Sequence, residues 1–265
     1  MDLREAKFTT EPTAARRHPW ERARCEVVID LLQRHLGLGI QAARTALDMG
    51  CGDAWLVDRI AQRLPQHRYL GVDTALVEPQ LSEQQQQYQG RVDLYTTLDQ
   101  AAAKLADTPV DVVFLLDVIE HIEDEVAFLR WMQTFPQITA QTAFVITVPA
   151  FQGLFCAHDE FLLHYRRYTR RSLQQALQNA GLRSRHDGYF FSSLIPPRVL
   201  QVALEKTGLR RPDPNGVGQW QGSEAATRAI TRILQTDYRL GQSLRKAGLH
   251  LPGLSTFSIA YPQKA

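Results

Sequence analysis

The sequence predicts an α/β fold with a doubly wound, seven-stranded and mostly parallel sheet, and three observations lead to this prediction. Short apolar runs alternate along the chain with segments whose apolar residues recur at helical spacing. The runs are uninterrupted, which is typical of parallel strands that helices cover on both faces. The 265 residues, 44% of them hydrophobic and 22% charged, are enough for one large core of this kind.

The strands are expected where the apolar runs lie, and the run at 110–116 is the strongest. The seven expected strands cover residues 45–50, 69–73, 92–96, 110–116, 143–148, 184–191 and 256–261. We expect the last one to be antiparallel. Helices are expected at 54–64 and 123–135, and a third should begin after Thr169, a good N-cap, and end at Gly181.

Four parts of the chain are expected from the caps and the loop-forming residues. They are an N-terminal arm and helix at 1–40, the core at 41–192, a helical cap insert at 193–252 and the final core strand at 253–265. Gly37 is expected to end the first helix, and the insert has its own helix starts at Pro196 and Ser223.

Charge and cysteine content exclude several classes of protein. The formal net charge is only +2, and the basic pairs are short and scattered, so nucleic-acid binding is not indicated. Cys25, Cys51 and Cys156 lie far apart, which suits a reducing compartment better than a disulfide framework or a zinc site. The N-terminus lacks an apolar signal segment, and no apolar stretch approaches the roughly 18 residues of a membrane span. A cytoplasmic protein is therefore predicted.

A glycine-containing turn is expected between the first strand and the helix after it. The turn reads Leu-Asp-Met-Gly-Cys-Gly-Asp at 47–53, and its glycines allow the backbone to approach a ligand at the carboxyl end of the strand. A dinucleotide-binding turn would need a third glycine where this chain has Trp55. The turn therefore favours a ligand without a pyrophosphate.

Asp73 ends the second expected strand, 21 residues after Gly52. A carboxylate at this point can accept hydrogen bonds from both hydroxyls of a ribose. The alternative is an aspartate that only caps the turn after the strand. Because Asp48, Gly50 and Gly52 accompany it, we favour the ribose contact.

Four motifs then follow one another at regular spacing. They are Leu-Asp-Met-Gly-Cys-Gly at 47–52, Gly-Val-Asp at 71–73, Leu-Asp-Val-Ile-Glu-His-Ile at 116–122 and Val-Ile-Thr-Val-Pro at 145–149. In order and spacing they resemble the motifs of class I S-adenosylmethionine-dependent methyltransferases, whose fold is Rossmann-like. The resemblance covers about residues 18–192 and the final strand, and it implies methyl transfer from S-adenosylmethionine.

The resemblance also implies which residues bind the cofactor. The expected set is Asp48, Gly50, Cys51, Gly52, Asp73, Thr74, Leu98, Asp117 and Val118. Gly50 and Gly52 would line the amino-acid part, Asp73 would hold the ribose, and residues 97–98 would flank the adenine.

The remaining part of this implied site lies after the fourth strand, where Asp117 and Val118 would be beside the methyl-bearing sulfur. This chain departs from the family pattern at two points. Ala54 stands where a third small glycine is frequent, and no acidic residue is evident at the place that often binds the adenine amino group.

Methylation of a hydroxyl needs a base that removes its proton, whereas a neutral amine does not need one. His121, directly after the fourth strand, and His158, beside Asp159, are the candidates. The alternative for His121 is a helix-start histidine that the backbone satisfies. The alternative for His158 is a structural cluster in which Arg166 or Arg167 bridges to Asp159, and we favour this slightly.

Residues 158–169 resemble a His-Asp…His-x-Arg-Arg-Tyr-Thr signature found in one branch of the family, and residues 18–22 resemble the N-terminal segment of that branch. A metal ion bound by His158 and His164 is not expected, because no third ligand is placed with them.

The expected acceptor is a small molecule that is methylated on oxygen or nitrogen. The insert at 193–252 leaves the sheet beside the acceptor side, so we expect it to cap the acceptor pocket, although a homodimer interface would explain the same helices.

The apolar segment 189–195 is expected to be buried, with acceptor binding or membrane contact as alternatives. An NAD(P)-dependent oxidoreductase and a methyltransferase-like binding subunit without catalysis are the alternative functions.

Overall fold

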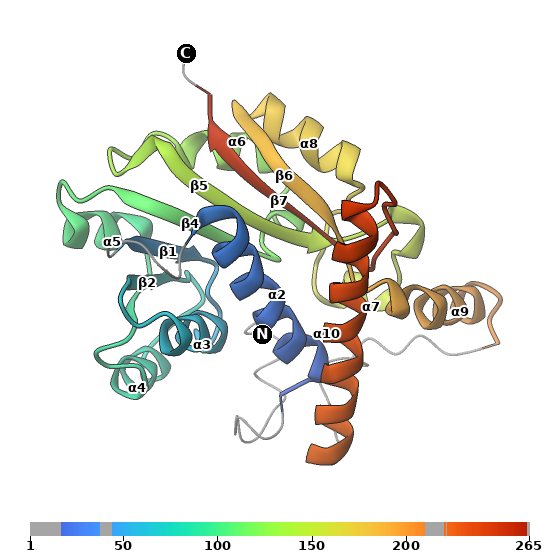
Figure 1. Cartoon of the computed structure of the whole chain (residues 1–265). Coiled ribbons are helices and arrows are strands. Elements are labelled where there is room, and N and C mark those ends of the chain that lie inside the picture. Colours follow the sequence, from blue (N-terminus) through green and yellow to red (C-terminus); the bar gives the residue numbers. More distant parts are fainter. Residues whose placement is uncertain (1–16, 38–43, 210–219, 221, 264–265) are drawn as a thin grey trace.

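The computed structural model describes residues 17–37, 44–209, 220 and 222–263. Its centre is a seven-stranded sheet in the order β3-β2-β1-β4-β5-β7-β6 (Figure 1). The strands are β1 (Thr45–Met49), β2 (Arg68–Val72), β3 (Asp93–Tyr95), β4 (Val110–Leu116), β5 (Ile138–Pro149), β6 (Leu182–Phe190) and β7 (Ser255–Pro262). Strands β1 to β5 pair in parallel, and β7 is antiparallel to both β5 and β6. The predicted fold class is confirmed, including the antiparallel last strand.

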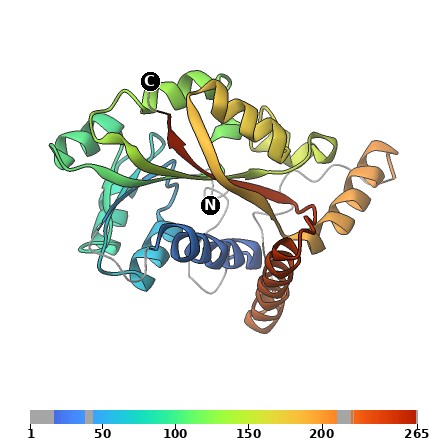
Figure 2. The same ribbon diagram turned by 45° about the horizontal axis from the view of Figure 1, so that its top comes forward.

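Helices cover both faces of the sheet (Figure 2). One face carries α2 (Pro19–Leu36), α3 (Trp55–Arg63) and α10 (Glu224–Lys246), and the other carries α5 (Leu98–Leu105), α6 (Glu125–Met132) and α8 (Arg170–Asn179). The other helical segments are α4 (Gln80–Gln87), η2 (Ile119–His121), η3 (Gln152–Leu154), α7 (Ala157–Phe161), η4 (Ser192–Leu194) and α9 (Ile195–Lys206). Each face of the sheet thus has its own apolar core, which explains why the central strands are apolar at successive positions.

The order of the strands creates a crevice in the middle of the sheet. From β1 the chain adds β2 and β3 on one side, and it then adds β4 and β5 on the other. In open parallel sheets, ligands bind at the carboxyl ends of the two strands where this direction reverses. Here these strands are β1 and β4, whose residues Asp48 and Phe114 are paired. The segments that follow them, from Gly50 and from Asp117, therefore lie at the crevice.

The predicted helix boundaries are confirmed where a capping residue marks them. Gly37 ends α2 in the left-handed conformation with a φ of 63°. The Thr169 hydroxyl accepts a hydrogen bond from the amide of Ser172 at the start of α8, and the Ser223 hydroxyl accepts one from Ala226 at the start of α10. These caps are local interactions, so the sequence alone could indicate them.

The elements that differ from the prediction include the following three. β5 begins at Ile138 instead of residue 143, because the mostly polar segment Thr-Ala-Gln-Thr at 139–142 extends the strand beyond its apolar run. Helix α5, which Thr97 caps, was not expected. The five-residue helix α7, inside the 158–169 signature, was not expected either.

The 193–252 insert contacts two separate parts of the core. Its helix α10 packs along α2, where the Tyr238 hydroxyl donates to Asp30 at 2.7 Å. Its helix α9 lies beside η3, and Arg198 of α9 reaches Asp159 of α7 at 3.1 Å. Residues 1–16 of the predicted N-terminal part at 1–40, and residues 211–216 of the insert, lie outside the described residues.

Candidate active site

The turn after β1 has the geometry that its glycines allow. Gly50 and Gly52 have φ values of 79° and 57°, a region that side-chain-bearing residues rarely adopt. The Gly50 amide donates to the carbonyl of Val72 at 2.8 Å and so ties the turn to β2. A Cβ atom on Gly50 would lie 2.7 Å from Cγ2 of Val118. The turn and the segment after β4 are therefore in close contact, which leaves no room for a side chain at Gly50.

Asp73 fixes this turn from the end of β2. Its Oδ2 accepts a hydrogen bond from the Gly52 amide at 2.8 Å, and its Oδ1 accepts one from the Ala75 amide at 2.9 Å. The alternative role expected from the sequence, capping of the next turn, is thus present. Because each carboxylate oxygen has a second lone pair and Asp73 is only half-buried, the carboxylate can still accept bonds from a ribose.

Asp48 and Cys51 are both buried at the carboxyl end of β1. Burial raises the pKa of Asp48 to about 7, while the nearby Arg24 opposes this rise. Burial also raises the pKa of the Cys51 thiol well above its usual range, so Cys51 is an unreactive packing residue. Its sulfur lies 2.9 Å from the position of a Cβ atom on Gly71, and it fills the space beside that glycine.

Two arginines of the N-terminal segment reach the crevice, and the sequence analysis did not identify them. Arg24 of α2 forms an ion pair with Oδ2 of Asp117, whose Oδ1 accepts a hydrogen bond from the Thr147 hydroxyl at 3.0 Å. Arg17 forms an ion pair with Asp53. The first turns of α2 are therefore held across the ends of β1 and β4.

The remaining residues of the expected cofactor set have different surroundings. Thr74 is exposed just after Asp73. Leu98 is only 4% exposed and packs in the apolar core beneath α5. Val118 packs against Gly50, as described above. The side chain of Leu98 therefore faces the core, and its backbone is the part that a ligand could reach.

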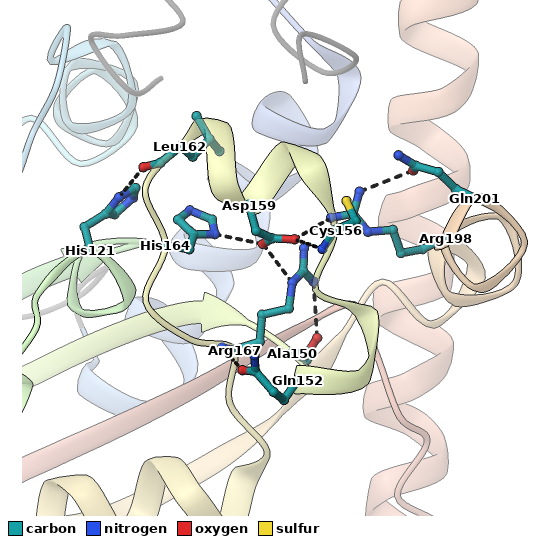
Figure 3. Close-up of polar contacts among 10 residues, drawn as sticks. All are labelled: His121, Ala150, Gln152, Cys156, Asp159, Leu162, His164, Arg167, Arg198 and Gln201. Atoms are coloured by element: carbon teal, nitrogen blue, oxygen red, sulfur yellow. Dashed lines mark hydrogen bonds and ion pairs between the residues drawn. The ribbon is translucent and has the colours of Figure 1, made fainter. Parts of the chain in front are cut away.

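Asp159 is the centre of a buried polar network on the other side of the crevice (Figure 3). Its side chain is fully buried, and its carboxylate accepts hydrogen bonds from His164 at 2.8 Å, Arg167 at 2.8 Å and Arg198 at 3.1 Å. The Cys156 amide donates to it as well, at 2.9 Å. These donors and the arginine charges hold the pKa of Asp159 well below its usual range.

The bridge to Asp159 that the structural alternative for the 158–169 segment expects is present, and Arg167 forms it. Arg166 instead pairs with Glu125. The imidazole that Asp159 orients is His164, which the sequence analysis did not select as a base. His158 is buried in α7.

His121 lies in η2, directly after β4, and its ring contacts the ring of His164 edge-on with centroids 4.5 Å apart. The Nδ1 atom of His121 is 3.0 Å from the carbonyl of Leu162 (Figure 3). The expected backbone contact of His121 is thus present. Its neighbour Glu120, which the sequence analysis did not select, is fully buried, and its carboxylate lies within 4.8 Å of ring nitrogens of both histidines.

Comparison with known proteins agrees with this geometry. A family model described as a methyltransferase domain matches residues 20–210, which is most of the chain. The chain belongs to this methyltransferase-domain family. The prediction of a methyltransferase that uses S-adenosylmethionine is therefore confirmed. No curated relative matches the methyltransferase significantly.

Solved structures share the fold of the methyltransferase at low sequence identity. The plantazolicin methyltransferase BamL, with S-adenosylhomocysteine and a triazolic desmethylPZN analog, has a TM-score of 0.53 and 12% identity over 98% of this chain and 88% of that one. A cyclopropane-fatty-acyl-phospholipid synthase-like protein from Lactobacillus casei has a TM-score of 0.52 and 14% identity over 98% and 97%. The 1,6-didemethyltoxoflavin-N1-methyltransferase of Burkholderia thailandensis has a TM-score of 0.50 and 14% identity over 92% and 80%. At these identities the likeness concerns the fold.

The described part of the methyltransferase contains no helix that is both long and apolar enough to cross a membrane.

Of the residues that sequence reasoning missed, Arg17 and Arg24 lie next to the 18–22 element that had already been singled out. Glu120 lies inside the 116–122 motif. Their positions in these motifs were the available signal, but their partners are distant in the sequence.

Proposed function

We propose that this methyltransferase transfers the methyl group of S-adenosylmethionine to an oxygen or nitrogen atom of a small-molecule acceptor. One observation carries the proposal: the glycine turn follows β1, and His121, whose ring contacts that of His164, follows the neighbouring strand β4, so both lie at the carboxyl ends of paired strands. A donor bound at the turn and an acceptor bound at the histidines would meet beside Asp117, which follows β4 directly. Methyl transfer is an in-line displacement, so this positioning supplies much of the catalysis.

On the donor side, the proposed contacts follow the polarity of the cofactor. Gly50 and Gly52 would lie against its amino-acid part, and Asp73 would accept hydrogen bonds from its ribose hydroxyls. Thr74 and the backbone of Leu98 would lie near the adenine, and Asp117 and Val118 near the methyl group. The cofactor supplies an activated methyl group on a sulfonium, so the chain has only to hold and orient it.

Arg24 is an additional donor-side residue that we propose. Its Nε atom is buried and lacks a hydrogen-bond partner among the described residues, and its Nη1 pairs with Asp117. A guanidinium with unused donors suits a carboxylate, which it can bind with two parallel hydrogen bonds. The cofactor carries such a carboxylate on its amino-acid part. Arg24 would therefore bind it while α2 covers the turn.

On the acceptor side, His121 and His164 are the groups that can act on an acceptor hydroxyl. The Nδ1 atom of each ring faces an oxygen acceptor, so the Nε2 atom is the one that carries the lone pair. His158, the second candidate base from the sequence, remains a proposal, but Asp159 orients His164 and not His158. An amine acceptor would need orientation only.

We further propose that the 193–252 insert covers the acceptor side through α9. The Arg198–Asp159 contact supports this, because Asp159 also orients His164. Helix α10 of the same insert packs along α2 instead. A homodimer interface on the exposed side of these helices remains the alternative use of the insert, and the cytoplasm remains the predicted location.

Calorimetric titration tests the donor side of this proposal. S-adenosylmethionine and S-adenosylhomocysteine should bind with a micromolar Kd, which corresponds to a binding free energy of about −8 kcal/mol, and NAD should not bind. A panel of small hydroxyl and amine compounds, assayed by release of S-adenosylhomocysteine, then tests the acceptor side, with His121→Ala as the comparison variant. Preferential NAD binding would replace the proposal by the oxidoreductase alternative. Cofactor binding without any turnover across the panel would favour the non-catalytic alternative.

A further inference from the structure

A group of three possible metal ligands lies at the carboxyl end of β4, and one of them, Glu120, has no role in the proposed function above. Glu120, His121 and His164 each offer an oxygen or nitrogen atom, and these atoms all lie within 4.8 Å of one another. The first two residues belong to η2, and the third lies after α7. The fold therefore assembles the group from two segments about forty residues apart.

The environment of Glu120 needs an explanation. The residue is fully buried, and within the described part of the chain no hydrogen-bond donor reaches either of its carboxylate oxygens. Most buried polar side chains in native structures have a partner, and an ionised carboxylate without one is especially unfavourable. A bound cation would satisfy both carboxylate oxygens and remove this cost.

The two histidines have the surroundings of metal ligands. The Nδ1 atom of His121 lies 3.0 Å from the Leu162 carbonyl, and the Nδ1 atom of His164 lies 2.8 Å from Oδ1 of Asp159 (Figure 3). Because a carbonyl and a carboxylate only accept hydrogen bonds, both Nδ1 atoms carry a proton, and in the neutral form of each ring the Nε2 atom carries the lone pair. Metal-binding histidines typically use the second ring nitrogen in this way, which fixes the tautomer and the ring orientation.

We propose that Glu120, His121 and His164 bind one divalent first-row transition-metal ion, of the Zn²⁺ or Co²⁺ type. Two imidazoles and one carboxylate are a known ligand set for such ions, and three protein ligands leave a position open. Asp159, itself held by Arg167 and Arg198, orients His164 and is thereby a positioning residue for the ion.

The role of this ion rests on the proposed function. If the acceptor binds beside Asp117, its hydroxyl oxygen can occupy the open coordination position. The ion lowers the pKa of the hydroxyl, which releases its proton to water, and the resulting oxyanion forms the O–CH3 bond as the C–S bond of the sulfonium breaks. The products are the methyl ether and S-adenosylhomocysteine. In this form of the enzyme the imidazoles act through the ion and are not free bases.

The test uses the full-length protein after dialysis against a chelator, titrated with Co²⁺ or Zn²⁺ alone. We expect one ion per chain, a visible Co²⁺ spectrum without thiolate charge-transfer bands, and a higher Tm with metal. Glu120→Gln and His164→Ala should weaken binding at least 100-fold and abolish the Tm increase. Asp159→Asn should weaken binding about 10- to 100-fold, as removal of an outer hydrogen-bond partner typically does.

His186→Ala is the matched control, because this histidine stacks on His35 away from the cluster and should leave metal binding unchanged. Glu120→Gln should also melt cooperatively without metal, since an amide removes the buried acid. Failure of the folded wild type to bind Zn²⁺ or Co²⁺, or equal binding by Glu120→Gln and His164→Ala, would overturn the proposal. If metal does not bind but the metal-free protein binds S-adenosylmethionine and transfers methyl groups, only the metal site is refuted and the proposed function stands.

Discussion

Cofactor binding should depend on pH through the protonation state of Asp48. Burial at the end of β1 raises the pKa of this carboxyl to about 7, from an ordinary value near 4. S-adenosylmethionine carries positive charge on its sulfonium and its amino group, so it should bind more tightly when Asp48 is ionised. Below pH 7 we therefore expect binding to displace a proton from Asp48.

The size of the effect follows from the fraction of ionised Asp48. With a pKa of about 7, this fraction rises from roughly 3% at pH 5.5 to about 50% at pH 7, so the apparent affinity should rise about fifteenfold. At pH 6, calorimetry in buffers of different ionisation enthalpy should detect the release of about 0.9 proton per cofactor bound. Asp48→Asn should bind with the same affinity at both pH values. A pH-independent affinity of the wild type would refute the proposed charge contact.

The same pKa also predicts how stability depends on pH. Folded Asp48 keeps its proton up to about pH 7, whereas the unfolded residue loses it near pH 4. The folded state therefore binds more protons in this range, and the contribution of Asp48 to stability falls by about 3 kcal/mol as the pH rises from 4 to 7. Urea unfolding without cofactor should show a steeper decline for the wild type than for Asp48→Asn. Equal slopes would mean that Asp48 is already ionised in the folded protein.

Three further substitutions test the site. Asp73→Ala should weaken cofactor affinity about ten- to hundredfold, because it removes charge-assisted hydrogen bonds of roughly 1.5–3 kcal/mol; unchanged affinity in calorimetry would mean that the carboxylate faces away from the ribose. Gly50→Ala should lower the Tm and weaken cofactor binding, because its φ of 79° and the contact of 2.7 Å with Val118 oppose a Cβ atom; a Tm equal to that of the wild type would contradict this reading of the turn. Arg198→Ala should lower acceptor turnover and leave cofactor affinity unchanged, because it removes the link from α9 to Asp159; a steady-state comparison with normal turnover would argue against the proposed cap.

The sequence predicted the fold because the signals for it are local. A buried parallel strand must be apolar at successive positions, and helix caps such as Gly37 and Thr169 act within a few residues of themselves. Helix α5 shows the limit of this reasoning. Its Thr97 cap was present in the sequence, but the preceding strand β3 is only three residues long and gave a weak signal.

The donor side of the site could be predicted for the same reason. Gly50 and Gly52 share one turn, and Asp73 reaches that turn from the adjacent strand β2, so the hydrogen bond between Asp73 and Gly52 is set by the sheet itself. The resemblance to the family added a role for each of these residues. Sequence reasoning also anticipated a bridge to Asp159 from Arg166 or Arg167, because these residues are close in the sequence, and the structure selects Arg167.

The sequence by itself determined the succession of the seven strands and of most helices, the glycine turn and the class of the enzyme. Only the tertiary structure decided which polar groups far apart in the sequence meet: Arg24 pairs with Asp117, which is 93 residues away, and His164 lies near Glu120 because the chain returns to β4 after α7. The physical reason is that a charge can pair with any opposite charge that packing brings within reach. The placement of α2 across the crevice and the fold of the 156–167 segment select those partners, and no local sequence pattern indicates either feature.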